Sequence, residues 1–420
     1  MSKNGHIKRD LDHVTARLKA WLPDGDKVTG LRVLSAGHSN ETFYIEGLNR
    51  VLRMPPSTGG LLPPYDMPKQ HRILAAVGAM QDGPPVPAVF EVCEDPEVLG
   101  DPFFVMEALV GEEYEYAAPQ WLLDASEAQR TAMSTRWVDA IASLHDRPAD
   151  EMPERHVSTR DYAENCLRMT QVPNGDPQLI RLLEDFVANP LATSGASTPV
   201  HGDPKIGNMM WRPDGTLVAM LDWEMAHQGE PLHDLGWALC LYNQPLASAG
   251  LDLPGWLQPE QMAERWEART GRSSEGLDKY MVLAFAKICA INTWGIAAET
   301  GGRGVDLVVD LVGGDAAMVS RLISAVAYRG RLSVVGLSSG EAPSIPFWEI
   351  VPKNMAVLGV LFGAEMHTPR AHAMLERHFA SAGVGKLTMP IAAAFPLAEA
   401  AAAHRFVEET RPLGRVLLLP

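Results

Sequence analysis

Two short segments in the middle of the chain carry residues that could handle phosphate chemistry. The first runs from His201 to Asn208 and places Lys205 two residues, and Asn208 five residues, after Asp203. The second is an apolar, strand-like run that ends at Asp222. A carboxylate can orient a hydroxyl and accept its proton, a lysine can neutralise phosphoryl oxygens, and carboxylate and amide oxygens are ligands for Mg²⁺. The set therefore predicts phosphoryl transfer from ATP with magnesium.

The alternative interpretation of this region is a purely structural turn. Asp203 could cap a helix, and Asn208 could fit a tight bend. A turn signal at Pro213–Gly215, followed by the apolar run and its terminal aspartate, favours the chemical interpretation. His201 is expected to be structural and bonded to nearby backbone, because Asp203 already fills the role of a base.

Composition sets the broad class of the protein. The chain has 420 residues, 46% of them apolar and 21% charged, which is typical of a soluble globular protein with two or three domains. A net charge of −16 argues against a nucleic-acid or membrane-surface partner. Tyr280–Ala298 is the most apolar run, but Lys287 interrupts it, so we expect a buried helix. Four scattered cysteines and a polar N-terminus predict a reduced, cytoplasmic protein.

The pattern along the chain predicts a small β-rich lobe, a helical region and a third segment. Strand-like alternation and one helical stretch occupy the first part, and amphipathic helices follow the lobe. The strand ranges are 28–54 and 86–109, and the helical ranges are 69–78, 127–145, 158–187 and 257–298. We place domains at 1–109, 110–300 and 301–420.

The last segment has the pattern of a parallel α/β unit. A strand, a helix and a second strand follow one another there, and further elements lie beyond them. The expected strands are 305–312, 331–336, 356–362 and 414–419, and the expected helices are 316–328 and 397–409.

Residues 25–298 resemble the aminoglycoside phosphotransferase-like kinases, relatives of protein kinases that act on small molecules. The resemblance rests on His201–Asn208, Asp222–Glu224, Pro231–Gly236 and Leu144–Asp146. It implies an α+β, bilobal protein-kinase-like fold. It also implies that Asp203 and Lys205 are catalytic, that Asn208 and Asp222 bind magnesium, and that a buried aspartate in the Pro231–Gly236 segment braces the catalytic loop.

The same resemblance implies a nucleotide site in the β-rich lobe. Arg53 stands where these kinases normally have a lysine, and Gln70 or a near neighbour stands where they have its glutamate partner. Arg53 can still grip phosphate oxygens, although a solvated strand end is the alternative. The adenine-binding hinge and the loop over the phosphates complete the expected cofactor-binding residues, which are Gly37, His38, Ser39, Asn40, Arg53, Gln70, Met106, Glu107 and Ala108. For the hinge, an ordinary strand end is equally consistent with the sequence.

The sequence does not identify the molecule that accepts the phosphoryl group. Val51–Pro56 resembles the kinase domains fused to some acyl-CoA dehydrogenases, which are thought to phosphorylate hydroxyacyl thioesters. Other relatives act on aminoglycosides, choline or sugars, so the fold does not name the small-molecule hydroxyl substrate. The altered Arg53/Gln70 pair leaves a second possibility, a pseudokinase that binds nucleotide without transferring phosphate.

Residues 303–420 resemble the C-terminal portion of medium-chain dehydrogenase/reductases of the quinone oxidoreductase type. The resemblance rests on Gly304–Asp310, Gly330–Gly336 and the run from Ala403 to Leu417. No G-x-G-x-x-G motif precedes them, so we expect a truncated, partial Rossmann segment rather than an NAD(P)-binding oxidoreductase module. Half of such a fold exposes a strand edge, which predicts packing on the kinase part or homodimer formation through this segment.

Overall fold

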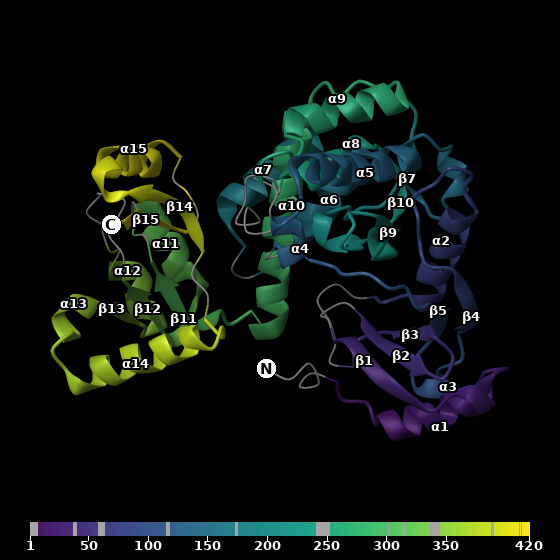
Figure 1. The fold of residues 1–420 in the computed structure, drawn as a ribbon, viewed down its shortest axis with the longest axis horizontal. Coiled ribbons are helices and arrows are strands. Elements are labelled where there is room, and N and C mark those ends of the chain that lie inside the picture. Colours follow the sequence, from purple (N-terminus) through teal and green to yellow (C-terminus); the bar gives the residue numbers. More distant parts are fainter. Residues whose placement is uncertain are drawn as a thin grey trace. The chain divides into compact units, whose positions relative to one another are not determined.

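The computed structural model places helices and strands in two compact units. It describes residues 7–36, 40–57, 64–114, 118–172, 175–240, 253–300, 302–311, 313, 316–335, 345, 347–387, 390–410, 412 and 414–420. The first unit comprises residues 1–171 and 177–295, and the second comprises 172–176 and 296–420. Figure 1 shows the helices and strands of both units.

The first unit begins with a five-stranded antiparallel sheet in the order β1-β2-β3-β5-β4. Its strands are β1 (Gly30–Ala36), β2 (Glu41–Glu46), β3 (Arg50–Met54), β4 (Val89–Cys93) and β5 (Phe103–Glu107). The helices of this lobe are α1 (Leu11–Trp21), α2 (Met67–Ala79) and α3 (Pro96–Leu99). The expected β-rich lobe with a helix after its third strand is therefore present.

Helix α1 is an element that the sequence analysis did not identify. Asp10 caps it by accepting hydrogen bonds from the backbone N–H groups of Asp12 and His13. Val14 and Leu18 are buried in a cluster with sheet residues, which include Phe43 and Ile45. The helix thus covers one face of the sheet.

The rest of the first unit is mainly helical, as expected. Its helices are α4 (Gln120–Leu123), α5 (Glu127–His145), α6 (Thr159–Thr170), α7 (Pro177–Ala188), α8 (Leu232–Cys240), α9 (Pro259–Thr270) and α10 (Leu277–Thr300). A small sheet pairs β6 (His156–Val157), β10 (His227–Gly229) and β7 (Thr198–Val200), and β8 (Met209–Trp211) pairs with β9 (Leu217–Met220). The expected 257–298 helical region is two helices, since Gly271 ends α9 in a left-handed conformation.

Helix α10 is long and apolar enough over Leu277–Ala298 to cross a membrane by length and composition. Its buried face holds Tyr280, Leu283 and Ala290, and it also buries Lys287. Only 33% of the apolar window is buried, and Val282 and Phe285 are exposed, so the buried helix expected from the sequence is confirmed for one face only.

The second unit contains parallel strand pairs, as its sequence pattern predicted. One sheet has the order β11-β12-β13, and a separate pair joins β14 to β15. The strands are β11 (Val305–Asp310), β12 (Val326–Val334), β13 (Ala356–Gly359), β14 (Ile391–Pro396) and β15 (Arg415–Leu419). The helices are α11 (Ala316–Ala325), α12 (Phe347–Ile350), α13 (Phe362–Glu365), α14 (Pro369–Gly383) and α15 (Ala400–Thr410).

Several boundaries in this unit were predicted wrongly, among them the start of the strand expected at Arg331, which begins at Val326. The helix expected to reach Tyr328 ends at Ala325, because Val326 already belongs to β12 and pairs with Val305. The strand expected to reach Phe362 ends at Gly359, and Phe362 begins α13.

A glycine in α8 offers a test of the packing in the first unit. A Cβ atom at Gly236 would lie 2.8 Å from the carbonyl carbon of Tyr280 on α10. We therefore expect Gly236→Ala to lower the free energy of unfolding by about 1–3 kcal/mol, measured by urea denaturation. The matched control is Gly78→Ala in α2, where the nearest atom, Val86 Cγ2, is 3.5 Å away and alanine favours the helix. Equal stability of the two variants would contradict this packing.

Candidate active site

The loop after β7 holds Asp203 by contacts from several sides. Asn208 donates a side-chain hydrogen bond to Asp203 Oδ2 at 3.0 Å, and Trp237 Nε1 donates to Oδ1 at 2.5 Å. Lys205 Nζ lies 3.8 Å from Oδ2. Burial raises the pKa of Asp203 above its ordinary value, although the charge of Lys205 opposes this. A fixed carboxylate with a raised pKa is suited to accept a proton.

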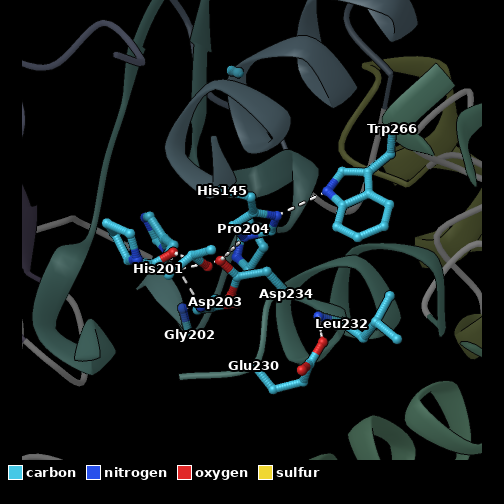
Figure 2. A network of polar contacts seen from close by, with 12 residues as sticks. His145, His201, Gly202, Asp203, Pro204, Glu230, Leu232, Asp234 and Trp266 are labelled. Atoms are coloured by element: carbon cyan, nitrogen blue, oxygen red, sulfur yellow. Dashed lines mark hydrogen bonds and ion pairs between the residues drawn. The ribbon is translucent and has the colours of Figure 1, made fainter. Parts of the chain in front are cut away.

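The backbone of this loop is anchored on the buried carboxylate of Asp234 in α8 (Figure 2). The N–H of His201 donates to Oδ2 and the N–H of Gly202 donates to Oδ1, each at 2.7 Å. His145 Nε2, at the end of α5, lies 3.1 Å from Oδ2, and Trp266 of α9 donates to His145 Nδ1 at 2.9 Å. The expected bracing aspartate is thus Asp234, and it joins three helices to the loop.

His201 ties the loop to the strand that leads to Asp222. Its Nδ1 accepts the backbone N–H of Asp203 at 3.1 Å, and its Nε2 lies 2.9 Å from the carbonyl oxygen of Leu221. The N–H of Leu221 in turn donates to the carbonyl of Asn208 at 2.8 Å. Burial lowers the pKa of His201, so the ring is neutral and structural, as expected. These bonds bring Asp222 beside the loop that carries Asp203.

Five polar side chains form a chain of hydrogen bonds between the β-rich lobe and the segment after β9. Arg53 donates from Nη2 to Asp222 Oδ1 at 2.6 Å and from Nε to Gln70 Oε1 at 3.1 Å. Gln70 donates to Asn40 at 3.4 Å, and Asn40 donates to Glu224 Oε2 at 3.1 Å. The Arg53/Gln70 pair, predicted from its positions in the sequence, is therefore present, and Arg53 reaches across to Asp222.

The remaining predicted nucleotide-binding residues have a mixed outcome. Gly37, His38 and Ser39 lie outside the described residues. Met106 and Glu107 belong to β5, and the N–H of Glu107 donates to the carbonyl of Ala88 at 2.8 Å. The Glu107 N–H group therefore already has a backbone partner. Ala108 is the residue of the expected hinge that follows the strand.

The donor set suits a magnesium ion held together with a nucleotide. Asp222 and Asn208 offer carboxylate and amide oxygens, and Mg²⁺ usually takes only one or two protein ligands beside phosphate oxygens and water. Within the described ranges, no cluster of three or more His, Cys, Asp or Glu side chains could hold a metal by itself. The residues present therefore fit a magnesium ion that is bound mainly by the phosphates of a nucleotide.

Two side chains of the site escaped the sequence analysis. Trp237 contacts the Asp203 carboxylate directly. Lys287 is only 3% exposed, and its Nζ donates to the carbonyl of Gly202 at 2.8 Å and lies 4.2 Å from the centre of the Trp237 ring. The sequence did contain one signal for Lys287. A charged group within the apolar run of α10 needs a polar partner, which here is the carbonyl of Gly202.

The Asp234 network leads to a stability prediction. Asparagine at this position cannot accept both backbone N–H groups through oxygen, so Asp234→Asn should lower the free energy of unfolding at pH 7 by about 2–4 kcal/mol. The matched control is Asp139→Asn, which removes a partly exposed ion pair with Arg265 and should cost less than about 1 kcal/mol. Urea denaturation measures both.

The pH dependence of that loss has a definite sign. Burial alone would raise the pKa of Asp234, but its hydrogen bonds and the neighbouring histidines lower it to about 2. A carboxylate whose pKa is lower in the folded state than in the unfolded state stabilises the fold fully above its unfolded-state pKa of about 3.9. This stabilisation is lost as the pH falls through the folded-state pKa. The gap between wild type and Asp234→Asn should thus shrink from pH 5 downwards. A gap that stays constant to pH 2.5 would refute this assignment.

Comparisons with known proteins find relatives for both parts of the chain. Residues 283–418 match the zinc-binding dehydrogenase family model. The mouse acyl-CoA dehydrogenase family member 10 is 32% identical over 222 residues, which is 50% of this chain and 20% of the relative. Bovine quinone oxidoreductase-like protein 2 is 30% identical over 120 residues, 28% of this chain and 34% of that protein. The chain spans between 20% and 39% of the length of the acyl-CoA dehydrogenase family relatives it matches.

The fold has a counterpart among solved structures. A Ralstonia eutropha protein, provisionally named an aminoglycoside phosphotransferase, superposes with a TM-score of 0.55 and 23% identity, covering 68% of this chain and 90% of its own. The expected kinase-like fold is thereby confirmed. The phosphotransferase enzyme family model matches residues 30–280, more than half of the chain. This chain belongs to the phosphotransferase enzyme family.

Proposed function

We propose that this protein transfers the γ-phosphoryl group of ATP to a hydroxyl of a small molecule. The observation that carries the proposal is the placement of Asp203. Its carboxylate is fixed beside Lys205 and Asn208, and its loop is hydrogen-bonded through His201 to the residue before Asp222. Membership of the phosphotransferase family supports the same reaction class.

Each residue has a role that its chemistry permits. Bound ATP with magnesium would supply the phosphoryl group and part of the charge neutralisation. Asp203 holds the acceptor hydroxyl in line and takes its proton. Lys205 offsets the charge that spreads over the phosphoryl oxygens, and Asn208 with Asp222 holds the metal ion. Arg53 keeps Asp222 in place from the β-rich lobe.

The acceptor belongs to one of two proposed classes. The matched acyl-CoA dehydrogenase family relatives favour a hydroxyacyl thioester, whereas the fold counterpart, by its name, favours an aminoglycoside-like molecule. The chain covers only part of those relatives, so their names support the first class without settling it.

One observation favours a rival function. Arg53 pairs with Asp222 at 2.6 Å, which engages an oxygen of the expected metal ligand. A protein that keeps this pair in the presence of nucleotide would bind ATP without transferring phosphate. An NAD(P)-binding module has less support, because the sequence lacks the glycine fingerprint that opens such a site.

The proposed base can be tested by a single substitution. Asp203→Asn keeps the size of the side chain but cannot accept the proton, so turnover should fall by about 100-fold or more, while ATP still binds. Asp214→Asn, in the exposed turn between β8 and β9, is the matched control and should keep turnover within about twofold of wild type. ATP consumption over hydroxyacyl thioesters, aminoglycosides, choline and sugars provides the assay.

If Asp203→Asn turned over substrate as fast as the wild type, Asp203 could not be the base. A thermal-shift comparison separates the rivals, because a ligand that binds only the folded state raises its melting temperature. ATP with magnesium should raise it and NADPH should not. Stabilisation by ATP with no transfer to any acceptor would favour the pseudokinase, and stabilisation by NADPH alone would favour the dehydrogenase-type module.

A further inference from the structure

The carboxylate of Asp203 is held from outside its own loop by a side chain of α8. Asn208 and Lys205, which contact its Oδ2, belong to the same short loop and would follow any movement of it. Trp237 reaches Oδ1 from α8, where its indole Nε1 donates at 2.5 Å. A carboxylate bonded at one oxygen can still rotate about its last torsion, whereas donors on both oxygens fix its plane. Trp237 therefore ties the orientation of the Asp203 carboxylate to the helical region.

Trp237 lies three residues after Asp234 on the same helix, and residues three apart share one face of an α-helix. Asp234 accepts two backbone N–H groups of the loop. Trp237 then donates to the side chain of Asp203, the residue that follows those two groups. One face of α8 thus holds both the backbone of the loop and the plane of its carboxylate.

The ring of Trp237 is held in turn by a buried lysine of α10. Lys287 Nζ lies 4.2 Å from the centre of the Trp237 ring and 5.1 Å from the centre of the Tyr162 ring. The same atom donates to the carbonyl of Gly202 at 2.8 Å. A cation within about 6 Å of an aromatic face is attracted to it, more strongly where water is excluded. Lys287 and both rings are buried, so this condition is met.

The surroundings of Lys287 suit an ammonium group. Burial lowers its pKa, although the nearby Cys166 and Asp203 oppose this. Its contacts described above are all with acceptors, namely a carbonyl oxygen and two ring faces. An ammonium group has three N–H donors and no lone pair, whereas a neutral amine would direct a lone pair at one of these acceptors. A positive charge over the Trp237 ring polarises the indole and strengthens its N–H as a donor.

From these contacts we infer that Trp237 and Lys287 are positioning residues for the proposed base. Lys287 fixes the indole ring and the carbonyl of Gly202, and Trp237 fixes the plane of the Asp203 carboxylate. The inference rests on the proposed kinase function, because it concerns the geometry in which Asp203 meets the acceptor hydroxyl. The alternative is that both side chains only fill the core between α6, α8 and α10. The two interpretations differ in their effect on turnover.

A kinetic test removes the donor and keeps the ring. Trp237→Phe should lower kcat by about tenfold, the effect of losing one hydrogen bond to a charged group, and leave the KM for ATP within about twofold. The matched control is Trp256→Phe. Trp256 is also a buried tryptophan, but its Nε1 has no hydrogen-bond partner among the described residues, so kcat should stay within about twofold of wild type. Initial rates of ATP consumption are measured with the fastest acceptor among the hydroxyacyl thioesters, aminoglycosides, choline and sugars.

Two substitutions of Lys287 test the charge over the ring. Lys287→Met keeps an apolar stem and removes the charge, so kcat should fall by about three- to tenfold. Lys287→Arg restores a cation that can lie over an aromatic ring and should recover part of that loss. Urea denaturation of each variant gives the folded fraction, which separates loss of positioning from loss of folding.

A spectroscopic test needs no acceptor. In protein labelled with ¹⁵N-tryptophan, the indole resonance of Trp237 is the one that disappears in Trp237→Phe. Because this N–H is bonded to a carboxylate, Asp203→Asn should move its proton resonance upfield, toward those of the other tryptophans. Lys287→Met should move it as well, and Trp256→Phe should leave it in place.

Three results would overturn the inference. They are an unchanged kcat in Trp237→Phe, a fall in kcat that only follows the folded fraction, and a Trp237 resonance that Asp203→Asn does not move. If the resonance moved as expected but the wild type transferred phosphate to no acceptor, the contact would be supported and the proposed reaction refuted instead.

Discussion

One buried carboxylate organises the active-site loop of this protein. Asp234 accepts the backbone N–H groups of His201 and Gly202 and is held by His145, which Trp266 holds in turn. An ionised group this deep is tolerated only when its hydrogen bonds are satisfied. The loop conformation that presents Asp203 is therefore coupled to the packing of α5, α8 and α9, and the geometry needed for phosphoryl transfer is a property of the whole helical region.

The second constraint joins the two parts of the kinase-like unit. The chain of hydrogen bonds from Asp222 through Arg53, Gln70 and Asn40 to Glu224 links β3, α2 and the residue before β2 to the segment after β9. The usual lysine and glutamate are replaced by a longer, forked cation and a neutral amide. Arginine can bond two partners at once, which explains how a single side chain reaches both Gln70 and Asp222. In the proposed reaction, the bound nucleotide would have to accommodate that arginine.

Sequence reasoning identified the residues of the candidate site better than the residues that support them. The string from Asp203 to Asn208 and the position of Asp222 could be singled out because phosphoryl transfer needs given residue types at given spacings; the structure places them beside one another, and their catalytic roles stay predictions. Trp237 and Lys287 were missed because they reach the loop from helices distant in sequence, where only tertiary packing defines a neighbour. Strand and helix ends in the second unit shifted by about three residues, as at Ala325 and Gly359, because pairing with other strands decides them.

The central proposal is that Asp222 holds a nucleotide-bound magnesium ion while Asp203 orients the acceptor hydroxyl beside the same nucleotide. A crystal structure of the protein with Mg²⁺ and a non-hydrolysable ATP analogue tests it most directly. Our account predicts the ion between Asn208 and Asp222, with the terminal phosphate facing Asp203 and Lys205. A triphosphate bound elsewhere, or the two carboxylates directed into separate regions with the nucleotide present, would contradict it.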